Sequence, residues 1–537
     1  MGEYLWWKHG VIYQVYPRSF QDSNGDGIGD LPGVLERLDY LNDGTPGSLG
    51  IDAIWFSPTY PSPMADFGYD VSDYEDVHPD FGTLADMDTL IEEAHRRGIR
   101  IILDFVPNHT SSQHPWFVES RSSRDSAKRD WYVWRDPKPD GSPPNNWIAV
   151  FGGPAWEWDQ KTQQYYLHMF LKEQPDLNWR NPAVEQRMHD VLRFWMKRGV
   201  DGFRIDVMDR ILKDPELRDN PPNPDRRWAE ALGQTALQIH TYDQNWPDII
   251  DAARRIRQVV DEFPERMTVG EVFGPPENIV RYYGGESLDG LHLAFNFPFV
   301  RITDGRWRAD HVRRQVDAFE AALPEGGWPN HVFGNHDVDR FVSRVNADGR
   351  GQERARVAAL LLLTLRGTPF IYYGEEIGME NADIPEHQLQ DPARFYGRGR
   401  DPERTPMQWT RDGGFTTGAP WLPYGDLTRN VADQRRDPAS LLSLYRKIIW
   451  TRRQSAALQF GAYTPLDGTP ESVFAFVRSH QGERTLTMLN FSNDAVSFTL
   501  PDGIEPEETL VGTHGEDVPV SRSVELRGNE GRLVRLA

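Results

Sequence analysis

Four carboxylates occupy comparable places in this sequence, each at or just after the end of a short β-rich run. They are Asp104, Asp206, Glu271 and Asp337. The active face of a barrel of parallel strands is built from the carboxyl ends of those strands, so the four side chains are expected to converge. A single carboxylate at a loop start is more often a helix cap or a surface residue. Four in register with the strands indicate a site for nucleophilic and acid/base chemistry.

Basic side chains accompany these carboxylates. In GFRIDV, Arg204 and Asp206 lie two residues apart, on the same side of a strand, where the guanidinium is expected to keep the carboxylate ionised. An ionised carboxylate is what a nucleophile requires. His336 directly precedes Asp337, and His109 lies in DFVPNH. Both imidazoles suit donation to substrate hydroxyl groups, and a buried structural role for either is the alternative.

The elements that must position these residues are eight β-rich runs between residues 10 and 455. The runs begin at Val11, Asp52, Ile99, Gly202, Arg266, Leu288, Asn330 and Thr368. They alternate with segments of helical periodicity, which predicts parallel strands joined by crossover helices. Eight such strands close a (β/α)8 TIM barrel, and an open doubly wound sheet is the alternative.

Some connections are too long to be simple loops. The connection after the third run is rich in Trp, Pro, Gly and Asp and predicts an inserted subdomain at residues 108–181. The connection after the eighth run, about 380–437, is expected to form part of a cleft wall, and a third insertion follows the fourth run at about 208–246. Residues 454–537 contain short alternating strands that predict a C-terminal antiparallel β-sandwich domain. Residues 1–107 and 182–453 are left for the barrel.

The composition limits the classes of partner. The formal net charge of -22 argues against nucleic acid and membrane surfaces, and favours a small neutral ligand. The absence of cysteine excludes disulfides and thiolate metal sites. The longest apolar run, near residues 357–365, is too short to span a bilayer, and no signal-peptide pattern opens the chain. A cytoplasmic monomer or small homo-oligomer is expected.

Four segments of the sequence resemble a known family. DFVPNH, GFRIDV, GEVF and GNHD, in this order and at these separations, resemble the signature regions of the α-amylase superfamily, glycoside hydrolase family 13. QDSNGDGIGDLPG and RTPMQW are similar to segments of its α-glucosidase and oligo-1,6-glucosidase branch. The resemblance runs nearly the whole length of the chain, and no catalytic position departs from the pattern. It implies a TIM barrel without an organic cofactor that acts on small neutral α-glucosides.

The resemblance also implies roles for three carboxylates. Asp206 would attack the anomeric carbon, while Glu271 would protonate the leaving oxygen and later activate water. Asp337 would hold the 2- and 3-hydroxyl groups of the sugar. Such a double displacement passes through a covalent glucosyl-enzyme and retains the anomeric configuration. The implied reaction is exo-acting hydrolysis of terminal, non-reducing α-linked glucose from di- and short oligosaccharides.

A substrate pocket is implied in the same way. Its eight members are Asp66, Tyr69, His109, Phe151, Phe170, Arg204, His336 and Arg400. Asp66 and Arg400 resemble a pair that closes the pocket at the 4-hydroxyl group of the terminal glucose. Phe151 and Phe170 resemble aromatic pocket walls, and a place in the subdomain core is equally open for both.

The segment QDSNGDGIGD has oxygen-bearing side chains at alternate positions, as calcium loops do. These are Asp22, Asn24, Asp26 and Asp30. Position 33 is Gly, so the segment is not an EF-hand. The resemblance implies a structural Ca²⁺ or Mg²⁺ here, with the Ile28 carbonyl as a further ligand. A glycine-rich surface turn without metal is the alternative.

Two other functions fit the same motifs. A transglucosylase or sucrose isomerase would use the same glycosyl-enzyme but pass glucose to a sugar. A non-catalytic barrel homologue would have lost its carboxylates, whereas all three are present here. Val207, which follows Asp206, resembles the residue of α-1,6-active members, but one side chain does not decide the linkage. Preference among α-1,4, α-1,6, sucrose and trehalose linkages stays open.

Overall fold

Parallel strands and helices alternate through most of the chain, which the computed structural model describes at residues 3–225, 233–395, 399–514 and 521–537. The strands of the central sheet are β1 Ile12–Val15, β2 Ala53–Phe56, β3 Arg100–Phe105, β7 Gly202–Ile205, β8 Met267–Gly270, β9 Leu293–Ala294, β10 Asn330–Val332 and β11 Thr368–Tyr372. Apart from Arg100, every residue in them is buried. Burial on both faces is typical of a parallel sheet that is covered by helices.

These strands form one parallel sheet in the order β10-β11-β1-β2-β3-β7-β8-β9. If β9 is placed next to β10 to close the order into a circle, each strand is followed in the sheet by the next strand of this sheet along the chain. The two end strands approach each other where the Asn296 N–H donates to Asn330 Oδ1 at 3.0 Å. The predicted barrel is therefore confirmed, because an open doubly wound sheet would reverse its strand order.

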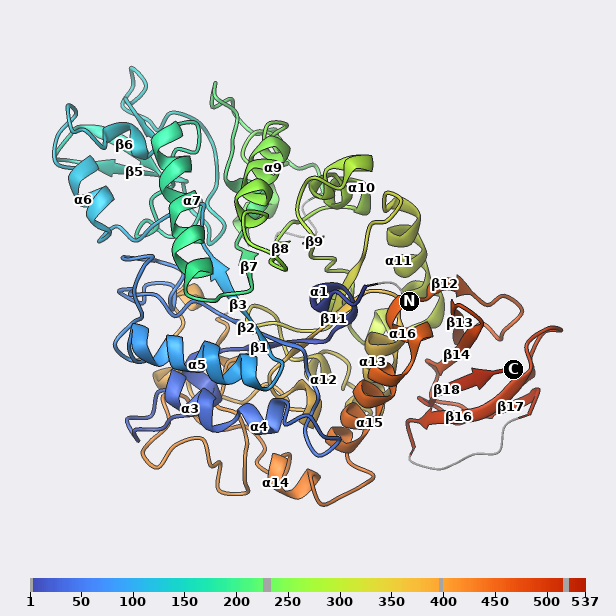
Figure 1. Cartoon of the computed structure of the whole chain (residues 1–537). Coiled ribbons are helices and arrows are strands. Elements are labelled where there is room, and N and C mark those ends of the chain that lie inside the picture. Colours follow the sequence, from blue (N-terminus) through green and yellow to red (C-terminus); the bar gives the residue numbers. More distant parts are fainter. Residues whose placement is uncertain (1–2, 226–232, 396–398, 515–520) are drawn as a thin grey trace.

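Longer helices cover the outside of this sheet (Figure 1). They are α3 Leu31–Glu36, α5 Leu84–Arg96, α7 Pro182–Lys197, α9 Ile249–Val260, α11 Ala309–Ala322, α13 Gly351–Thr364 and α15 Leu441–Gln454. In α7, Asn181 caps the N-terminus by accepting from the Ala183 N–H, and Pro182 is the first helical residue. Shorter helices are α1 Trp6–His9, α2 Pro17–Phe20, α4 Leu38–Leu41, α6 Pro115–Ser120, α10 Pro276–Ile279, α12 Phe341–Arg344, α14 Val431–Gln434 and α16 Ala456–Phe460.

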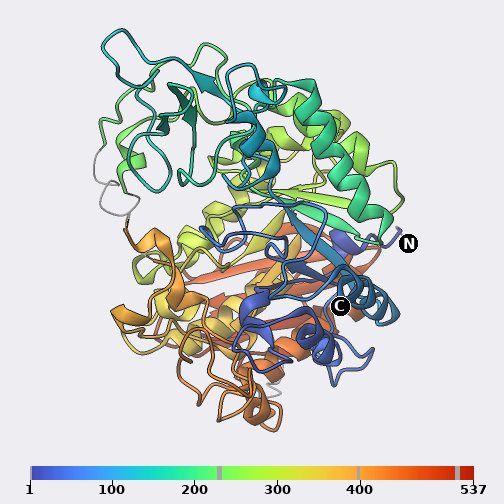
Figure 2. The same ribbon diagram turned by 90° about the vertical axis from the view of Figure 1, so that its left-hand side faces the viewer.

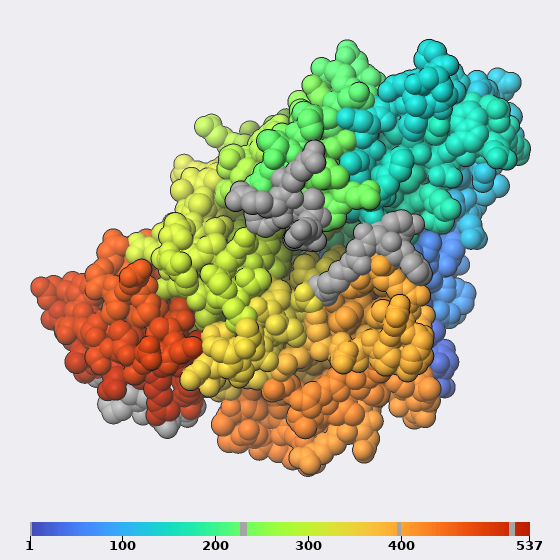
Figure 3. Space-filling model, turned by 180° about the vertical axis from the view of Figure 1, so that it is seen from behind, coloured from blue at the N-terminus to red at the C-terminus, as the bar shows by residue number. Residues whose placement is uncertain are grey.

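The insertion between β3 and α7 forms a small subdomain with a core of its own. It contains β4 Trp134–Arg135, β5 Trp156–Asp159 and β6 Gln164–Leu167, paired antiparallel in the order β4-β6-β5. Trp147, Met169 and their neighbours pack beneath this sheet. The subdomain lies at the opposite end of the molecule from the C-terminal strands (Figures 1 and 3). Its exact limits, 108–181, stay a prediction.

The C-terminal segment forms two antiparallel sheets that share an apolar core. The larger sheet consists of β12 Ala462–Pro465, β13 Val473–His480, β14 Glu483–Asn490, β18 Gly531–Leu536 and β16 Pro506–Gly512. The smaller one pairs β15 Val496–Thr499 with β17 Ser523–Leu526. The larger sheet also packs against α13, which is buried along most of its length. This double cover explains the long apolar run at residues 357–365.

Two details differ from the sequence prediction. The sixth strand was expected from Leu288 but begins at Leu293, because Leu288 has a positive φ of 49° and the Gly290 N–H closes a turn onto the Tyr283 carbonyl. The helix α16 stands between the predicted domain boundary at residue 454 and the first C-terminal strand. No helix in the described ranges is both long enough and apolar enough to cross a bilayer.

Candidate active site

The carboxylates singled out in the sequence lie together at one end of the barrel. The Asp206 N–H donates to the Phe105 carbonyl at 2.8 Å, and the Glu271 N–H donates to the Ile205 carbonyl at 2.8 Å. The parallel ladder therefore continues one residue beyond β7 and β8, and it places these two side chains directly at the strand ends. Figure 2, turned by 90° from Figure 1, shows the insertion after β3 at the top of the molecule.

Arg204 connects three of the carboxylates. Its Nη1 lies 2.6 Å from Asp206 Oδ1 and 2.8 Å from Asp104 Oδ1. Its Nη2 lies 2.7 Å from Glu271 Oε2. All four side chains are almost completely buried. The predicted contact between Arg204 and Asp206 is confirmed, and the same guanidinium also holds the other two.

The cluster holds more negative charge than its one guanidinium can balance. Burial raises the pKa of Asp206 well above its usual value, Arg204 opposes that rise, and Glu271 and Asp104 add to it. Burial likewise raises the pKa of Asp104 to about 6 against the effect of Arg204. One guanidinium faces three buried carboxylates, so burial and mutual repulsion both act against full ionisation of the cluster. Arg204 opposes the rise in the pKa of Asp206, and the ionised state of Asp206 at neutral pH stays a prediction.

Asp337 has the opposite electrostatic setting. Its Oδ1 lies 3.0 Å from Arg400 Nη1 and 2.9 Å from Arg404 Nη2. Although burial acts to raise it, His336, Arg400 and Arg404 hold the pKa of Asp337 below its usual range. The side chain is 34% exposed, far more than the other carboxylates of the site. An ionised, accessible carboxylate of this kind can accept hydrogen bonds from hydroxyl groups.

His336 and Tyr69 join the two carboxylate groups. The Tyr69 hydroxyl lies 2.9 Å from Asp104 Oδ2 and 2.7 Å from His336 Nε2, and the two rings are stacked. His336 Nε2 also lies 3.2 Å from Asp337 Oδ2. Burial lowers the pKa of His336 to about 3, so the ring is neutral. A neutral ring with its proton on Nε2 donates toward Asp337, which leaves Nδ1 to accept from Gln14 Nε2 at 2.8 Å.

Asp66 and Arg400 form the predicted ion pair across the site. Arg400 Nη2 lies 2.6 Å from Asp66 Oδ1, while its Nη1 reaches Asp337. Asp391 holds the same guanidinium from behind, with Oδ2 2.8 Å from Nε and Oδ1 2.9 Å from Nη2. Burial raises the pKa of Asp66, and Arg400 opposes that rise. The arginine thus fixes two carboxylates that originate in distant parts of the chain.

The remaining predicted pocket residues surround this pair. His109 is buried, with Nε2 3.1 Å from Gln174 Nε2, and its ring lies 5.0 Å from that of Phe170. The Phe151 ring is 6.1 Å from Phe170, and the Arg400 guanidinium lies 5.4 Å from its centre. Both phenylalanines are partly exposed. Phe170 also packs against the subdomain core, so it contacts both surroundings that the sequence left open.

The sequence did not single out three residues that the structure places in this network. Arg404 lies in the quoted RTPMQW segment, but nothing distinguished it from its neighbours. Asp391 and Gln174 lie in irregular segments without a spacing signal; Gln174 Nε2 donates to Asp66 Oδ2 at 3.0 Å. Residues 396–398, which precede Arg400, and residues 226–232 of the insertion after β7 lie outside the described residues.

The candidate metal loop folds onto its own backbone. The Asp22 carboxylate accepts from the N–H groups of Asn24 and Gly27, and the Asn24 and Asp26 side chains accept from the N–H groups two residues on. The described residues contain no group of three or more His, Cys, Asp or Glu side chains arranged for a metal ion. The predicted metal ligands in this loop also include the side-chain amide of Asn24 and the carbonyl of Ile28. Oxygen donors of these types fit Ca²⁺ or Mg²⁺.

Asp30 differs from the other predicted ligands because both of its oxygens are used in the fold. Oδ1 accepts from the Gly33 N–H at 2.6 Å and so caps α3, while Oδ2 accepts from the backbone and hydroxyl of Ser23. Asp30 is buried, unlike the exposed side chain of Asp26. Asp30 therefore holds the loop against α3.

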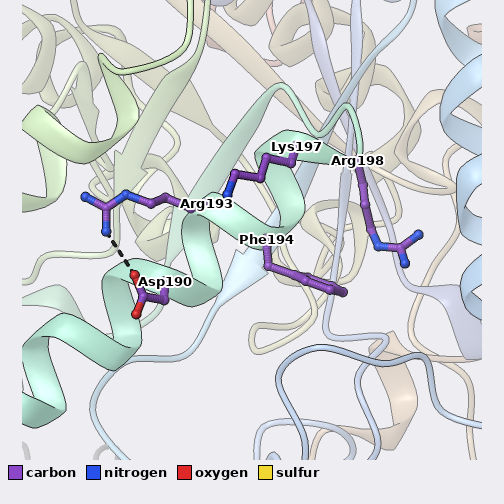
Figure 4. A pocket seen from close by; sticks show the side chains of 5 residues that line it. All are labelled: Asp190, Arg193, Phe194, Lys197 and Arg198. Atoms are coloured by element: carbon purple, nitrogen blue, oxygen red, sulfur yellow. Dashed lines mark hydrogen bonds and ion pairs between the residues drawn. The ribbon is translucent and has the colours of Figure 1, made fainter.

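A surface hollow on α7 lies away from this site. Figure 4 shows its lining, which consists of Asp190, Arg193, Phe194, Lys197 and Arg198. Lys197 ends α7, and β7 begins a few residues later, so this part of the helix lies near the amino ends of the strands. The carboxylates lie at the carboxyl ends. Arg193 and Arg198 are moreover paired with Asp190 and Asp88.

Comparisons with known proteins agree with this geometry. The family described as alpha amylase, catalytic domain, matches residues 14–461. A probable α-glucosidase from Rhizobium meliloti (strain 1021) is 48% identical over 520 residues, which cover 94% of this chain and 92% of that protein. An oligo-1,6-glucosidase from Parageobacillus thermoglucosidasius is 38% identical over 574 residues, which cover 99% of each. The crystal structure of an alpha-glucosyl transfer enzyme, XgtA, matches with a TM-score of 0.92 at 40% identity and covers 100% of both chains.

Proposed function

Because this chain belongs to the α-amylase family of glycoside hydrolases, we propose that it is a retaining, exo-acting α-glucosidase. Its substrates would be di- and short oligosaccharides with a terminal, non-reducing α-linked glucose. The reaction would be a double displacement in which Asp206 is the nucleophile and Glu271 the general acid/base. The observation that carries this proposal is that one guanidinium, that of Arg204, holds both carboxylates.

The shared guanidinium supports retention of configuration. Retaining enzymes have their two carboxyl groups about 5 Å apart, whereas inverting enzymes leave roughly 6.5–9.5 Å for a water molecule. Asp206 Oδ1 lies 2.6 Å from Arg204 Nη1 and Glu271 Oε2 lies 2.7 Å from Nη2, so both carboxylates bind the same small planar group. This closeness favours direct attack by Asp206.

In the first step, the free oxygen of Asp206 attacks the anomeric carbon as the glycosidic bond breaks. Arg204 occupies Asp206 Oδ1, which leaves Oδ2 as the attacking atom. Arg204 and the Val207 N–H both act on Glu271 Oε2, which leaves Oε1 to carry the proton to the leaving oxygen. Three buried carboxylates around one guanidinium disfavour full ionisation of the cluster, which supports the presence of the proton that this step consumes.

In the second step, Glu271 removes a proton from water, and the resulting hydroxide equivalent attacks the glucosyl ester. The bond to Asp206 breaks, glucose leaves with its α configuration, and both carboxyl groups return to their starting states. Asp337, held ionised by its arginines, would bind sugar hydroxyl groups more tightly in the distorted transition state than in the ground state.

The Asp66–Arg400 pair supports exo specificity. Arg400 joins Asp66 to Asp337, so one side of the site is bounded by a fixed network of charged groups. Such groups suit the hydroxyls of a terminal glucose and would block a continuing chain. His109, Phe151 and Phe170 would line the same pocket.

A structural metal remains part of the proposal. Asp22, Asn24, Asp26 and the Ile28 carbonyl would hold Ca²⁺ or Mg²⁺, and Asp30 would support the loop. No step of the reaction depends on it.

Transglucosylation is the second candidate, because XgtA is described as an alpha-glucosyl transfer enzyme and matches this chain closely. Initial rates on maltose, isomaltose, sucrose, trehalose and maltotetraose, with analysis of all products, distinguish the two. Hydrolysis predicts free glucose as the main product and slower turnover of the tetrasaccharide. Oligosaccharide or isomeric products with little glucose would favour transfer instead.

Proton NMR of the first product formed should show α-glucose, and β-glucose would contradict the retaining mechanism.

A further inference from the structure

The short turn that follows Asp206 contacts the strand end of Glu271 at two places. The Val207 N–H donates to Glu271 Oε2 at 3.0 Å. Two residues later in the turn, Asp209 Oδ2 accepts from the Phe273 N–H at 2.8 Å. One contact holds the carboxylate itself, and the other holds the backbone just beyond it. Together they bracket Glu271.

The backbone of this turn is constrained to make these contacts. Val207 has a φ of 34° and a ψ of 48°, the left-handed region that β-branched residues rarely adopt. The turn also lies directly on β8. A Cβ at Gly270 would sit 3.6 Å from Met208 Cβ and only 2.4 Å from Leu291 Cδ1, so a side chain before Glu271 would require Leu291 to move.

Asp209 is the centre of the second contact. Its side chain is fully buried, and its Oδ2 also accepts from Gln244 Nε2 at 2.7 Å. Its carbonyl accepts from the Asn245 N–H at 2.7 Å. The carboxylate thus joins three segments that are distant in sequence: the turn after β7, the strand end after β8 and residues 244–245.

The burial of this carboxylate is costly for the fold. Burial raises the pKa of Asp209 to about 6, although Arg210 and the two hydrogen-bond donors act to lower it. A carboxylate in the protein interior lowers stability unless its partners compensate fully. A group with that cost beside a reacting pair is a candidate for a functional role.

We propose that Asp209 is a positioning residue for Glu271: it fixes the backbone at residues 271–273 so that the acid oxygen faces the glycosidic oxygen. The inference rests on the proposed function, because it assumes that Glu271 is the acid. Asp209 makes no contact with the substrate in this account. It sets the distance and angle at which Glu271 acts.

The consequence is a selective dependence on the leaving group. Cleavage of maltose requires protonation of a poor leaving group, whereas α-glucosyl fluoride needs little assistance from an acid. Misplacing a catalytic group by about 1 Å costs on the order of 100-fold in rate. Asp209→Ala should therefore lower kcat/KM for maltose by about 10- to 100-fold and for α-glucosyl fluoride by less than about threefold.

Asp209→Asn is the conservative test. Because both donors act on the same oxygen, the amide oxygen of asparagine can accept both hydrogen bonds. This variant should keep the wild-type ratio of the two kcat/KM values. Asp214→Ala is the matched control, since Asp214 is a buried carboxylate of the same insertion whose side chain binds the N–H groups of Glu216 and Arg218 instead. It should leave the ratio unchanged.

Glu271→Gln separates this inference from the proposed function on which it rests. Suppose that Glu271→Gln lowers kcat/KM selectively for maltose, whereas Asp209→Ala lowers kcat/KM equally for maltose and α-glucosyl fluoride. Asp209 then does not position the acid. An equal loss with a lower melting temperature would indicate a purely structural role and would also overturn the inference. If Glu271→Gln itself shows no dependence on the leaving group, the assignment of the acid fails first.

Discussion

Arg204 differs from the other basic residues of the site because it serves three carboxylates at once. Its two terminal nitrogens lie within 2.8 Å of Asp104, Asp206 and Glu271. Only a planar fork can make such contacts, since an ammonium group is a single point of charge. The residue therefore holds both reacting carboxylates on one planar group.

Arg204→Lys should therefore lower kcat/KM by about 10²- to 10³-fold, the usual effect of losing one donor that stabilises a transition state. The charge is retained, so the loss would report geometry. Steady-state kinetics on 4-nitrophenyl α-glucoside measures it, and circular dichroism confirms the fold. Activity within threefold of wild type would show that the bridging contacts are dispensable.

The Asp66–Arg400 pair allows a double-mutant cycle. Asp66→Ala and Arg400→Ala should each lower kcat/KM for maltose by about 10- to 100-fold, the range expected for hydrogen bonds between charged groups. The double variant should lose little beyond Arg400→Ala, because the two side chains contact each other at 2.6 Å. Fully additive losses would mean that the two residues act separately.

At this scale the sequence predicted some contacts and missed others for a clear reason. Arg204 and Asp206 are two residues apart on one strand, so their contact follows from strand geometry alone. Other contacts join irregular segments, whose path no periodicity in the sequence predicts. These are the contacts of Asp391, Gln174 and Asp209. The rise in the pKa of Asp206 was not predicted either, because it depends on burial and on how many carboxylates share one guanidinium.

Among the elements, the loop at residues 21–30 connects the candidate metal site to the cleft wall. The Asp22 N–H donates to the Phe415 carbonyl at 2.9 Å, and the Trp421 N–H donates to the Gly27 carbonyl at 3.0 Å. Thr416 also donates to Asp22 Oδ2. A cation that orders this loop would therefore stabilise the segment after β11.

Removing divalent cations with a chelator should lower the melting temperature and leave kcat on an aryl α-glucoside within about twofold when measured well below that temperature. Thermal unfolding with and without added Ca²⁺ or Mg²⁺ provides the comparison. A loss of turnover at an unchanged melting temperature would make the metal catalytic, and no change in either quantity would remove the metal from the account.

Strand positions were predictable because eight buried runs alternate with amphipathic helices, and the barrel followed from their number and order. The ends of the strands were harder to predict from the sequence. The predicted run NHVFGNHD contains only the short strand β10, since its polar second half turns into the site. The backbone twist at Leu288 similarly delays β9, and no residue type signals it.

At the scale of the whole molecule, a buried acid other than the site carboxylates affects how stability depends on pH. Glu375 lies just beyond β11, where Tyr445 donates to its Oε1 at 2.9 Å. Burial raises the pKa of Glu375 from 4.5 to about 8. The folded state therefore favours the protonated form, and this stabilising contribution is present below pH 4.5 and lost as the pH rises through about 8.

Glu375→Gln mimics the protonated side chain and keeps the acceptor for Tyr445. Its melting temperature should match that of the wild type near pH 5 and exceed it by a few degrees, roughly, at pH 9. Calorimetry at the two pH values tests this. A variant that is equally destabilised at both would show that the buried carboxylate is not the source of the alkaline loss.

Asp206 should form a covalent glucosyl ester during turnover. A slow-turnover analogue such as 5-fluoro-α-glucosyl fluoride should accumulate that ester, which mass spectrometry of a digest can assign to one residue. The account predicts a single fluoroglucosyl addition on Asp206, absent from Asp206→Ala. Label on Glu271 or Asp104, or turnover to β-configured product without any label, would contradict it.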